Sequence, residues 1–262
     1  MREAPAAGLR ARLAVIALLA AVPGTAEETS VYRARGADAQ LFDQYDNDGY
    51  SLSVALSPDG SLELTVRVSD APLRSRAPFP TGLPRDPALS SAPERDGLAR
   101  RLASGSTLQA EAVERVLLGV AALVRYDPDR LRRQDPAAVL ASRRAHCVGF
   151  AELAVDLLRR LSIPALTVQG ILRTRPDQAG YEPEIGGAYH RWIEVYYPDR
   201  GFAFSDPWSS VNGVDARYVP FARRSLERPR LLLLETVTAS GRVSYPVRRS
   251  GEAIVRVRPI AH

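Results

Sequence analysis

The first patterned segment of the chain alternates between polar and apolar residues. Residues 50–56 and residues 62–68 each alternate, and the sequence Pro58-Asp59-Gly60 lies between them. A period of two is typical of half-buried strands, and Pro, Asp and Gly favour a tight turn. We therefore predict a small β-rich unit over residues 27–70 that contains this hairpin.

A proline-rich segment follows the hairpin. Six prolines lie within residues 71–97, together with serine, glycine and arginine. Proline lacks a backbone N–H and restricts the residue before it, so this composition favours an extended linker over a helix or a strand. We place a domain boundary at this linker and assign residues 98–262 to a second domain.

The second domain opens with apolar residues that recur every three or four positions, as in amphipathic helices. Ser106 and Gln109 have the spacing of a capping box, and the helix predicted after them carries one apolar face. That face consists of Val113, Val116, Leu117, Val120, Leu123 and Val124. Asp135-Pro136 predicts the start of a short second helix. A third helix is predicted over residues 145–161.

Patterns typical of strands follow the third helix. We predict strands at residues 165–171, 189–197 and 201–205, and further strands near residues 231–237, 242–247 and 253–257. The sequence Pro198-Asp199-Arg200-Gly201 predicts a turn that returns the third of these strands beside the second.

The amino-terminal residues have the pattern of an export signal. Three arginines lead into an uninterrupted apolar run over residues 13–22, and Pro23-Gly24-Thr25-Ala26 then supplies small residues for cleavage near Ala26. A membrane-spanning helix needs roughly 20 apolar residues, so a cleaved signal over residues 1–26 is favoured over a membrane anchor. We therefore expect a secreted or periplasmic protein without stable membrane insertion.

The basic residues of the chain are all arginine, 35 in number. The absence of lysine excludes a P-loop, a pyridoxal Schiff base and a Ser–Lys dyad, because each needs a lysine amine. The arginines are interspersed with 30 acidic residues, so no basic stripe points to a nucleic-acid partner. With three histidines and one cysteine, a zinc site is not expected, and we expect no other cofactor.

Cys147 is the single cysteine of the chain, so it cannot form a disulfide within the chain. It stands in the first turn of the predicted third helix, where unpaired backbone N–H groups and the helix dipole favour a thiolate over a thiol. Arg143 and Arg144 add positive charge nearby. This placement indicates a nucleophile, and a buried inert cysteine is the alternative.

A thiol nucleophile needs a base, and the chain offers His146, His190 and His262. His262 is the last residue of the sequence. His146 is adjacent to Cys147, and on a helix the side chains of neighbours point about 100° apart, so we expect His146 to make a polar contact at the helix start. His190 opens a predicted strand and is the expected base.

Asp206 is the expected third member, which would hold the imidazole in one tautomer. It lies at the end of the strand that returns beside the strand of His190. A plain four-residue turn would pair Asp206 with Ile193, on the face opposite His190. We therefore expect a β-bulge, or a break at Pro207, to re-aim the carboxylate.

Four stretches, taken in order, resemble the transglutaminase-like superfamily. They are Val124-Arg125-Tyr126, residues 146–153, residues 161–165, and residues 190–195 followed by Asp206-Pro207. The resemblance implies an α+β fold with a papain-like transglutaminase core, in which the cysteine helix packs on an antiparallel sheet that carries the histidine and the aspartate. Ala145 departs from the pattern, because the family often has a glycine there.

By this resemblance Cys147 is the nucleophile, His190 the base and Asp206 the orienting acid. The expected reaction is acyl transfer, in which the thiolate attacks an amide or ester carbonyl, a thioester forms, and water or an amine resolves it. The Cys147 N–H is one expected donor to the oxyanion. Trp192 and Trp208 are expected either to wall an acyl tunnel and bind substrate or to lie in the core.

The sequence thus predicts an exported, bacterial-type cysteine acyltransferase, peptidase or amidohydrolase. Its expected substrates are peptides or proteins, including those of the cell envelope. A catalytically inactive binding or assembly module of the same fold is one alternative. An all-β binding protein with an incidental cysteine is another, and it requires residues 107–161 not to be helical.

Overall fold

The computed structural model describes residues 26–80, 86, 88–178, 180–223 and 232–261. Apart from Ala26, the predicted export signal of residues 1–26 lies outside the described residues. Within the described ranges, none of the helices has the length and apolar character needed to cross a membrane.

The α-helices of the described residues lie between residues 93 and 160. They are α1 (Pro93–Leu102), α2 (Gln109–Leu123), α3 (Pro136–Ser142) and α4 (Cys147–Arg160), and a 3₁₀ helix, η1 (Ala39–Leu41), lies among the N-terminal strands. The region predicted to be helical is therefore helical, which excludes the all-β alternative. The side chain of Asp135 accepts a hydrogen bond from the N–H of Ala138 and caps α3, as predicted.

Two helix starts differ from the prediction. Helix α1 begins at Pro93, inside the segment predicted as a linker, because a proline suits the first helical position and acidic residues follow in the first turn. Helix α2 is not capped by Ser106. Its first turn is closed by the Glu111 carboxylate, which accepts hydrogen bonds from the backbone N–H groups of Thr107 and Leu108.

The strands of the described residues form two larger antiparallel sheets and two small ones. The five-stranded sheet has the order β12 (Leu233–Ser240), β1 (Glu27–Arg35), β4 (Leu62–Ser69), β3 (Tyr50–Leu56) and β2 (Tyr45–Asn47). The central sheet has the order β11 (Tyr218–Pro220), β7 (Ala165–Leu172), β8 (Ala188–Tyr197) and β9 (Gly201–Ser205). The small sheets are β10 (Ser210–Val211), β14 (Ala253–Val257) and β13 (Val247–Ser250), and β5 (Arg125–Tyr126) with β6 (Arg144–Ala145).

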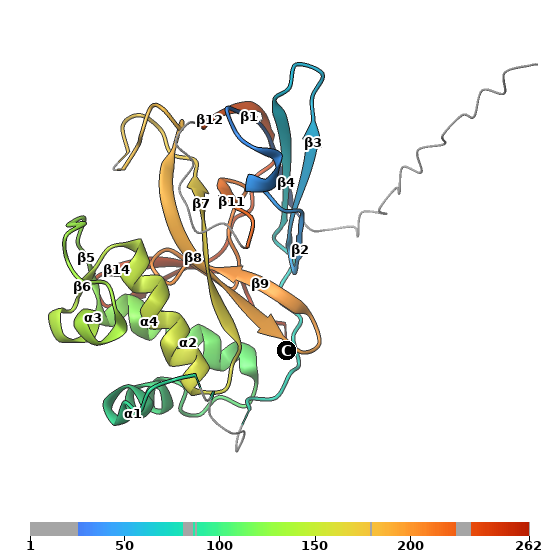
Figure 1. The fold of residues 1–262 in the computed structure, drawn as a ribbon. Helices are drawn as coiled ribbons and strands as arrows, with labels where there is room; N and C mark the ends of the chain where they lie inside the picture. The colour runs from blue at the N-terminus through green and yellow to red at the C-terminus, as the bar shows by residue number, and fades with distance from the viewer. Residues whose placement is uncertain (1–25, 81–85, 87, 179, 224–231, 262) are drawn as a thin grey trace, which may run out of the picture.

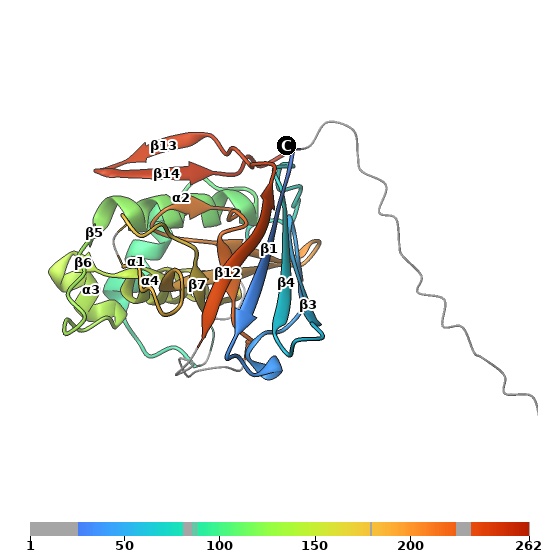
Figure 2. The same cartoon turned by 90° about the horizontal axis from the view of Figure 1, so that it is seen from above.

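The five-stranded sheet joins distant parts of the chain. The β-rich unit predicted over residues 27–70 supplies four of its strands. β12 pairs with β1, so that Ala34 lies opposite Leu234 (Figure 2). The strand predicted near residues 242–247 is wrong, because strand β13 begins only at Val247. Pro246, which has no N–H for a sheet ladder, precedes it.

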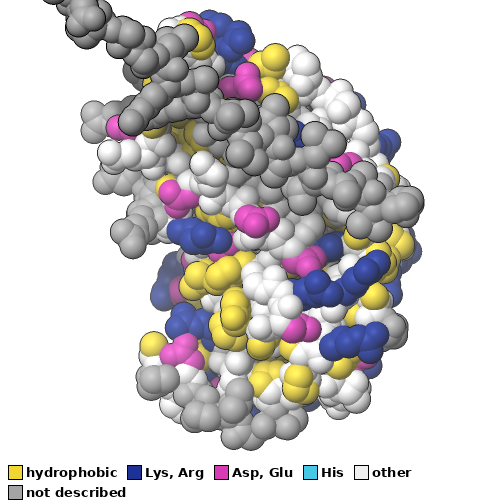
Figure 3. Space-filling model, turned by 90° about the vertical axis from the view of Figure 1, so that its right-hand side faces the viewer, with side chains coloured by type: hydrophobic (Ala, Val, Ile, Leu, Met, Phe, Trp, Pro, Cys, Tyr) yellow, Lys and Arg dark blue, Asp and Glu magenta, His cyan; other side chains and the backbone are white. Residues whose placement is uncertain are grey.

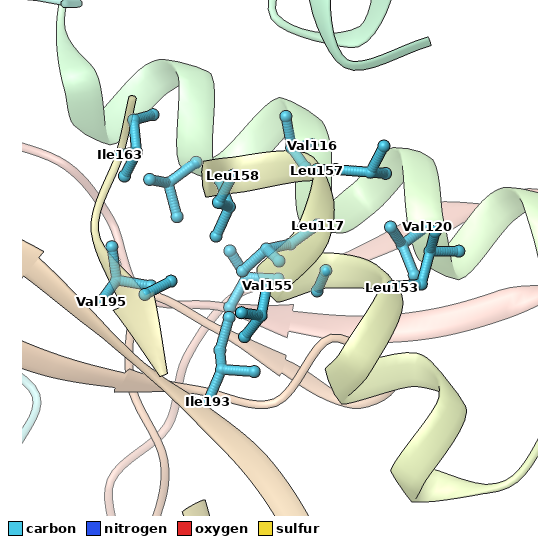
Figure 4. Packing of buried hydrophobic residues seen from close by; sticks show 14 of the residues in the cluster. Val116, Leu117, Val120, Leu153, Val155, Leu157, Leu158, Ile163, Ile193 and Val195 are labelled. Atoms are coloured by element: carbon cyan, nitrogen blue, oxygen red, sulfur yellow. The ribbon is translucent and has the colours of Figure 1, made fainter. Parts of the chain in front are cut away.

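The central sheet lies between the helices and the five-stranded sheet (Figure 1). On one face, Ile193 and Val195 of β8 pack with apolar side chains of α2 and α4 (Figure 4). On the other face, Trp192 and Phe204 share a second core with residues of the five-stranded sheet. The fold is therefore α+β, with the helix of Cys147 packed on an antiparallel sheet.

The surface mixes charges of both signs. On the face shown in Figure 3, arginine and acidic side chains are interspersed with apolar and uncharged ones. Exposed pairs such as Arg35 with Glu235 and Arg67 with Glu27 belong to the five-stranded sheet.

Candidate active site

The N-terminus of α4 presents Cys147 at its first helical position. His146 is the N-cap, with extended backbone (φ −94°, ψ −174°), and its Nδ1 accepts a hydrogen bond from the N–H of Val148 at 3.3 Å. The amide oxygen of Gln134 accepts the N–H groups of His146 at 3.2 Å and of Gly149 at 3.1 Å. These contacts occupy the N–H groups of the second and third helical positions, Val148 and Gly149, and fix where the helix begins.

His146 makes the polar contact predicted at the helix start, but it does not lie on the helix as expected. The helix begins at Cys147, and the extended His146 is its N-cap. His146 is therefore among the groups that lower the pKa of the Cys147 thiol, together with His190.

The β8–β9 hairpin brings Asp206 to the face of His190 without a bulge. The turn has three residues instead of four, because Tyr197 pairs with Gly201, whose φ of 74° closes the turn. Ile193 consequently pairs with Ser205, and the next residue, Asp206, falls opposite Trp192. Trp192 and His190 lie two positions apart and share one face of the sheet. The predicted bulge is therefore wrong, and a register shifted by one residue replaces it. The alternative, a break at Pro207, is close to what is observed, because β9 ends at Ser205.

His190 and Asp206 form a buried pair. Their side chains are 6% and 2% exposed, and His190 Nε2 lies 2.7 Å from Asp206 Oδ2. Asp206 Oδ1 accepts the N–H of Trp208 at 2.9 Å. Its Oδ2 also accepts the hydroxyl groups of Tyr218 at 2.9 Å and of Ser209 at 3.0 Å. The carboxylate is thus held from several sides. Because Nε2 of His190 faces Asp206, Nδ1 is the ring nitrogen left for the thiol, and Cys147 and His190 line the same depression.

The charge of the thiol follows from these contacts. Burial alone would raise the pKa of Cys147. Hydrogen bonds with His146 and His190, the positive charge of His190, and a backbone hydrogen bond with Arg191 together lower this pKa to about 6. The thiol is therefore largely a thiolate at neutral pH, which is the form that acts as a nucleophile.

The imidazole and the carboxylate stabilise each other in their charged forms. Burial alone would lower the pKa of His190, but the charge and hydrogen bond of Asp206, with the contact to Cys147, raise it to about 10. Burial alone would raise the pKa of Asp206. The charge and hydrogen bond of His190, the N–H of Trp208 and the hydroxyl of Tyr218 hold it below its usual range. The resting site is thus a thiolate–imidazolium pair backed by a carboxylate.

Cys147 lines a narrow depression, and Tyr126 and Trp208 line a separate, wider groove. The depression is lined by Cys147, Val148, Gln169, Gly170, Tyr189, His190, Arg191 and Phe221. The groove has a volume of about 550 Å³, and Tyr126, Arg143 and Trp208 contribute to its lining. The rings of Tyr126 and Trp208 stack with centroids 4.5 Å apart. Because Tyr126 pairs with Ala145 and Trp208 donates to Asp206, this stack stands close to the reactive groups.

The two tryptophans have different places. Trp208 is partly buried and lines the groove. Trp192 is fully buried, and its ring stacks on the ring of His190 at 6.0 Å. Trp192 therefore has no surface to offer a substrate in this conformation. Over the described part of the chain, no group of three His, Cys, Asp or Glu side chains could hold a metal ion.

Sequence reasoning missed Tyr218 and Ser209. Ser209 follows Asp206 by three residues, and a serine so placed often bonds to an aspartate in a turn. Tyr218 lies on β11, and only the pairing of β11 with β7 brings it to Asp206. No local pattern in the sequence marks that pairing.

Comparison with known proteins gives a family match and several structural similarities. The model of the Transglutaminase-like superfamily matches residues 96–207. No curated protein matches the sequence. A candidate cysteine protease from Cytophaga hutchinsonii is 13% identical, with a TM-score of 0.43 over 87% of this chain and 94% of its own. The periplasmic domain of TgpA from Pseudomonas aeruginosa is 17% identical, with a TM-score of 0.37 over 70% of this chain and 86% of its own.

Proposed function

We propose that this chain, whose residues 96–207 match the model of the transglutaminase-like superfamily, is an exported cysteine acyltransferase or amide hydrolase with the catalytic triad Cys147, His190 and Asp206. The observation that carries the proposal is that Cys147 and His190 line one depression, with His190 Nε2 2.7 Å from Asp206 Oδ2. Each member has the partner that its role needs, since a thiol must be ionised by a base and the base must be oriented by an acid.

The first half of the reaction forms a thioester. The Cys147 thiolate attacks the carbonyl carbon of an amide, and the new C–S bond pushes the carbonyl electrons onto oxygen. The N–H of Cys147, at the first position of α4, has no intrahelical partner and is aligned to stabilise that oxyanion. The His190 imidazolium then donates its proton to the leaving nitrogen as the C–N bond breaks, and ammonia or an amine departs.

The second half resolves the thioester. Neutral His190 accepts a proton from water or from an incoming amine, which attacks the thioester carbonyl. The C–S bond breaks and the thiolate returns beside the imidazolium. Water gives hydrolysis, and an amine gives transamidation or cross-linking. Asp206 keeps its charge throughout and holds the ring for both proton transfers.

The substrate in this proposal is a peptide or protein, including those of the cell envelope. The groove beside the thiol supports it, because about 550 Å³ suits a peptide segment and a stacked aromatic pair offers a flat apolar wall. We assign Trp208 to substrate contact on this basis. Trp192 supports the site from within the core by packing against His190.

Trapping the acyl-enzyme tests the proposal. The mature protein is incubated with a library of glutamine-containing peptides, quenched in acid and digested, and the peptide that holds Cys147 is examined by mass spectrometry. We expect an added acyl mass on Cys147 that is absent from the Cys147→Ser variant and disappears when hydroxylamine is added. A thiol that acquires no acyl group, and that iodoacetamide alkylates no faster than free cysteine, would instead favour a binding or assembly module.

A further inference from the structure

The five-stranded sheet touches the candidate active site through three buried tyrosines. Each donates its hydroxyl to a backbone carbonyl of one short segment, residues 216–221. The pairs are Tyr32 with Ala216 at 2.7 Å, Tyr45 with Phe221 at 2.7 Å and Tyr50 with Tyr218 at 2.6 Å. The three tyrosines come from β1, β2 and β3, so most of the sheet takes part.

The segment that they hold carries the side chain that contacts Asp206. The Tyr218 hydroxyl donates to Asp206 Oδ2 at 2.9 Å and lies 3.0 Å from Ser209 Oγ, which contacts the same carboxylate oxygen. Tyr218 is 1% exposed, so water does not replace this donor. A continuous series of hydrogen bonds therefore runs from Tyr50 through Tyr218 to Asp206 and His190.

We propose that the five-stranded sheet is part of the catalytic apparatus: Tyr50 holds the backbone of Tyr218, and Tyr218 is a positioning residue that keeps Asp206 oriented toward His190. This role rests on the proposed thiol chemistry. It gives the unit of residues 27–70 a function in the reaction, beyond covering one face of the central sheet.

The chemistry of tyrosine suits this task. Burial raises the pKa of Tyr218 well above its usual value, so the hydroxyl remains a proton donor over the whole working range. A neutral donor fixes the direction of the carboxylate without adding a charge that would compete with the imidazolium. The ring itself packs edge-on against Trp192 at 5.4 Å and His190 at 5.8 Å. Replacement by phenylalanine keeps this packing and removes only the hydroxyl.

The test measures the rate of iodoacetamide alkylation of Cys147 from pH 4 to pH 10 in the full chain. The variants are Tyr218→Phe and Tyr50→Phe. Tyr245→Phe is the matched control, since its buried hydroxyl also bonds to a backbone carbonyl, that of Ser69, outside the segment 216–221. Thermal unfolding of each variant records the effect on stability separately.

A less firmly held Asp206 stabilises the imidazolium less, so the thiol pKa must rise. We expect the acid limb of the Tyr218→Phe profile to move up by roughly one pH unit, which slows alkylation at pH 6 about five-fold. We expect Tyr50→Phe to move the acid limb in the same direction by a smaller amount. Tyr245→Phe should leave the limb in place, even if its melting temperature falls as much as those of the other two variants.

The outcomes separate this proposal from the proposed function. A wild-type thiol no more reactive than free cysteine would contradict both. If the wild-type thiol is reactive but the acid limb of the Tyr218→Phe profile stays in place or moves to lower pH, this proposal alone is contradicted. If Tyr218→Phe does not fold, the Tyr50→Phe variant is the test. A Tyr50→Phe profile that coincides with the Tyr245→Phe profile would contradict the role of the sheet.

Discussion

The two faces of strand β8 differ sharply in chemistry. Toward the helices, the strand presents Ile193 and Val195, which are fully buried among apolar side chains. Toward the five-stranded sheet, it presents His190, Trp192 and Glu194, which are also buried, yet two of them are ionisable. One face thus stabilises the strand by exclusion of water, and the other does so by a network of hydrogen bonds and charges.

Burial of the polar face of β8 depends on the five-stranded sheet. Glu194 is fully buried, and its carboxylate accepts hydrogen bonds from Asn47 of β2 at 3.0 Å and from Arg223 at 2.6 Å. Buried charges are tolerated only where such partners are supplied. The helices thus complete the apolar core on one face of β8, whereas the five-stranded sheet makes it possible to bury reactive groups on the other face.

Replacing His190 tests the reactive end of the polar face and has the largest expected effect. In His190→Ala the thiol loses its base and the proton donor for the leaving group, so turnover of a peptide amide should fall by on the order of 10³-fold or more. The rate is measured as release of ammonia or of the amine.

The pH profile of the wild type is the reference for this variant. The thiol pKa is lowered to about 6 and the imidazole pKa raised to about 10. Activity should therefore rise as the pH increases through 6, because the thiolate forms, and fall above 10, because the imidazolium loses its proton. Retention of this bell shape in His190→Ala would show that another group supplies the base.

Ile193→Ala tests the apolar face. It removes buried methyl groups and leaves a cavity between β8 and α4, which should lower the free energy of unfolding by about 3 kcal/mol. Urea unfolding measures this loss. The acid limb of the alkylation profile should stay in place, because the substituted side chain is apolar and lies on the face of β8 opposite His190. A shifted limb would mean that the two faces are coupled.

Glu194→Gln tests the charge on the polar face away from the thiol. The neutral amide keeps the size of the side chain but weakens the hydrogen bonds with Arg223. The Arg223 side chain is 41% exposed, so in the variant it can bond to water instead. We therefore expect the free energy of unfolding to fall by about 1–2 kcal/mol. Glu235→Gln is the matched control. It breaks an exposed pair with Arg35 and should cost less than about 0.5 kcal/mol. Equal losses in the two variants would contradict the importance of burial.

Trp192→Phe has the smallest expected effect. The indole Nε1 is buried and has no hydrogen-bond partner among the described residues, so the substitution removes an unsatisfied donor while it opens a small cavity. The two effects oppose each other, so the free energy of unfolding measured in urea should change by less than about 1.5 kcal/mol. A larger loss would indicate that the indole N–H has a bound partner such as water.

The apolar face of β8 and the helices against it could be predicted because their information is local. The apolar spacing of α2 and α4 and the limits of β8 and β9 follow from periodicity within each segment. Cys147 and His190 could also be found locally, because the sequence contains so few alternatives. The chain order of these residues then sufficed for the family resemblance.

The polar face could not be predicted to the same depth because its information is not local. The register that aims Asp206 depends on a turn one residue shorter than its composition suggested. Tyr218 reaches Asp206 through the pairing of β11 with β7, and β12 completes a sheet that begins at Glu27. Such long-range pairings leave no periodic signal in the sequence.

The pairing of β1 with β12 has a consequence for the newly made polypeptide. Ala34 and Leu234 are partners, so β1 has to wait for nearly the whole described chain before its outer edge is covered. Until then its backbone N–H and C=O groups are open to strands of other molecules, and contacts so distant along the chain form late. The tyrosine contacts of the same sheet reach residues 216–221, so they too form late. During synthesis, the helix of Cys147 is therefore made well before the contacts that hold the backbone of Tyr218.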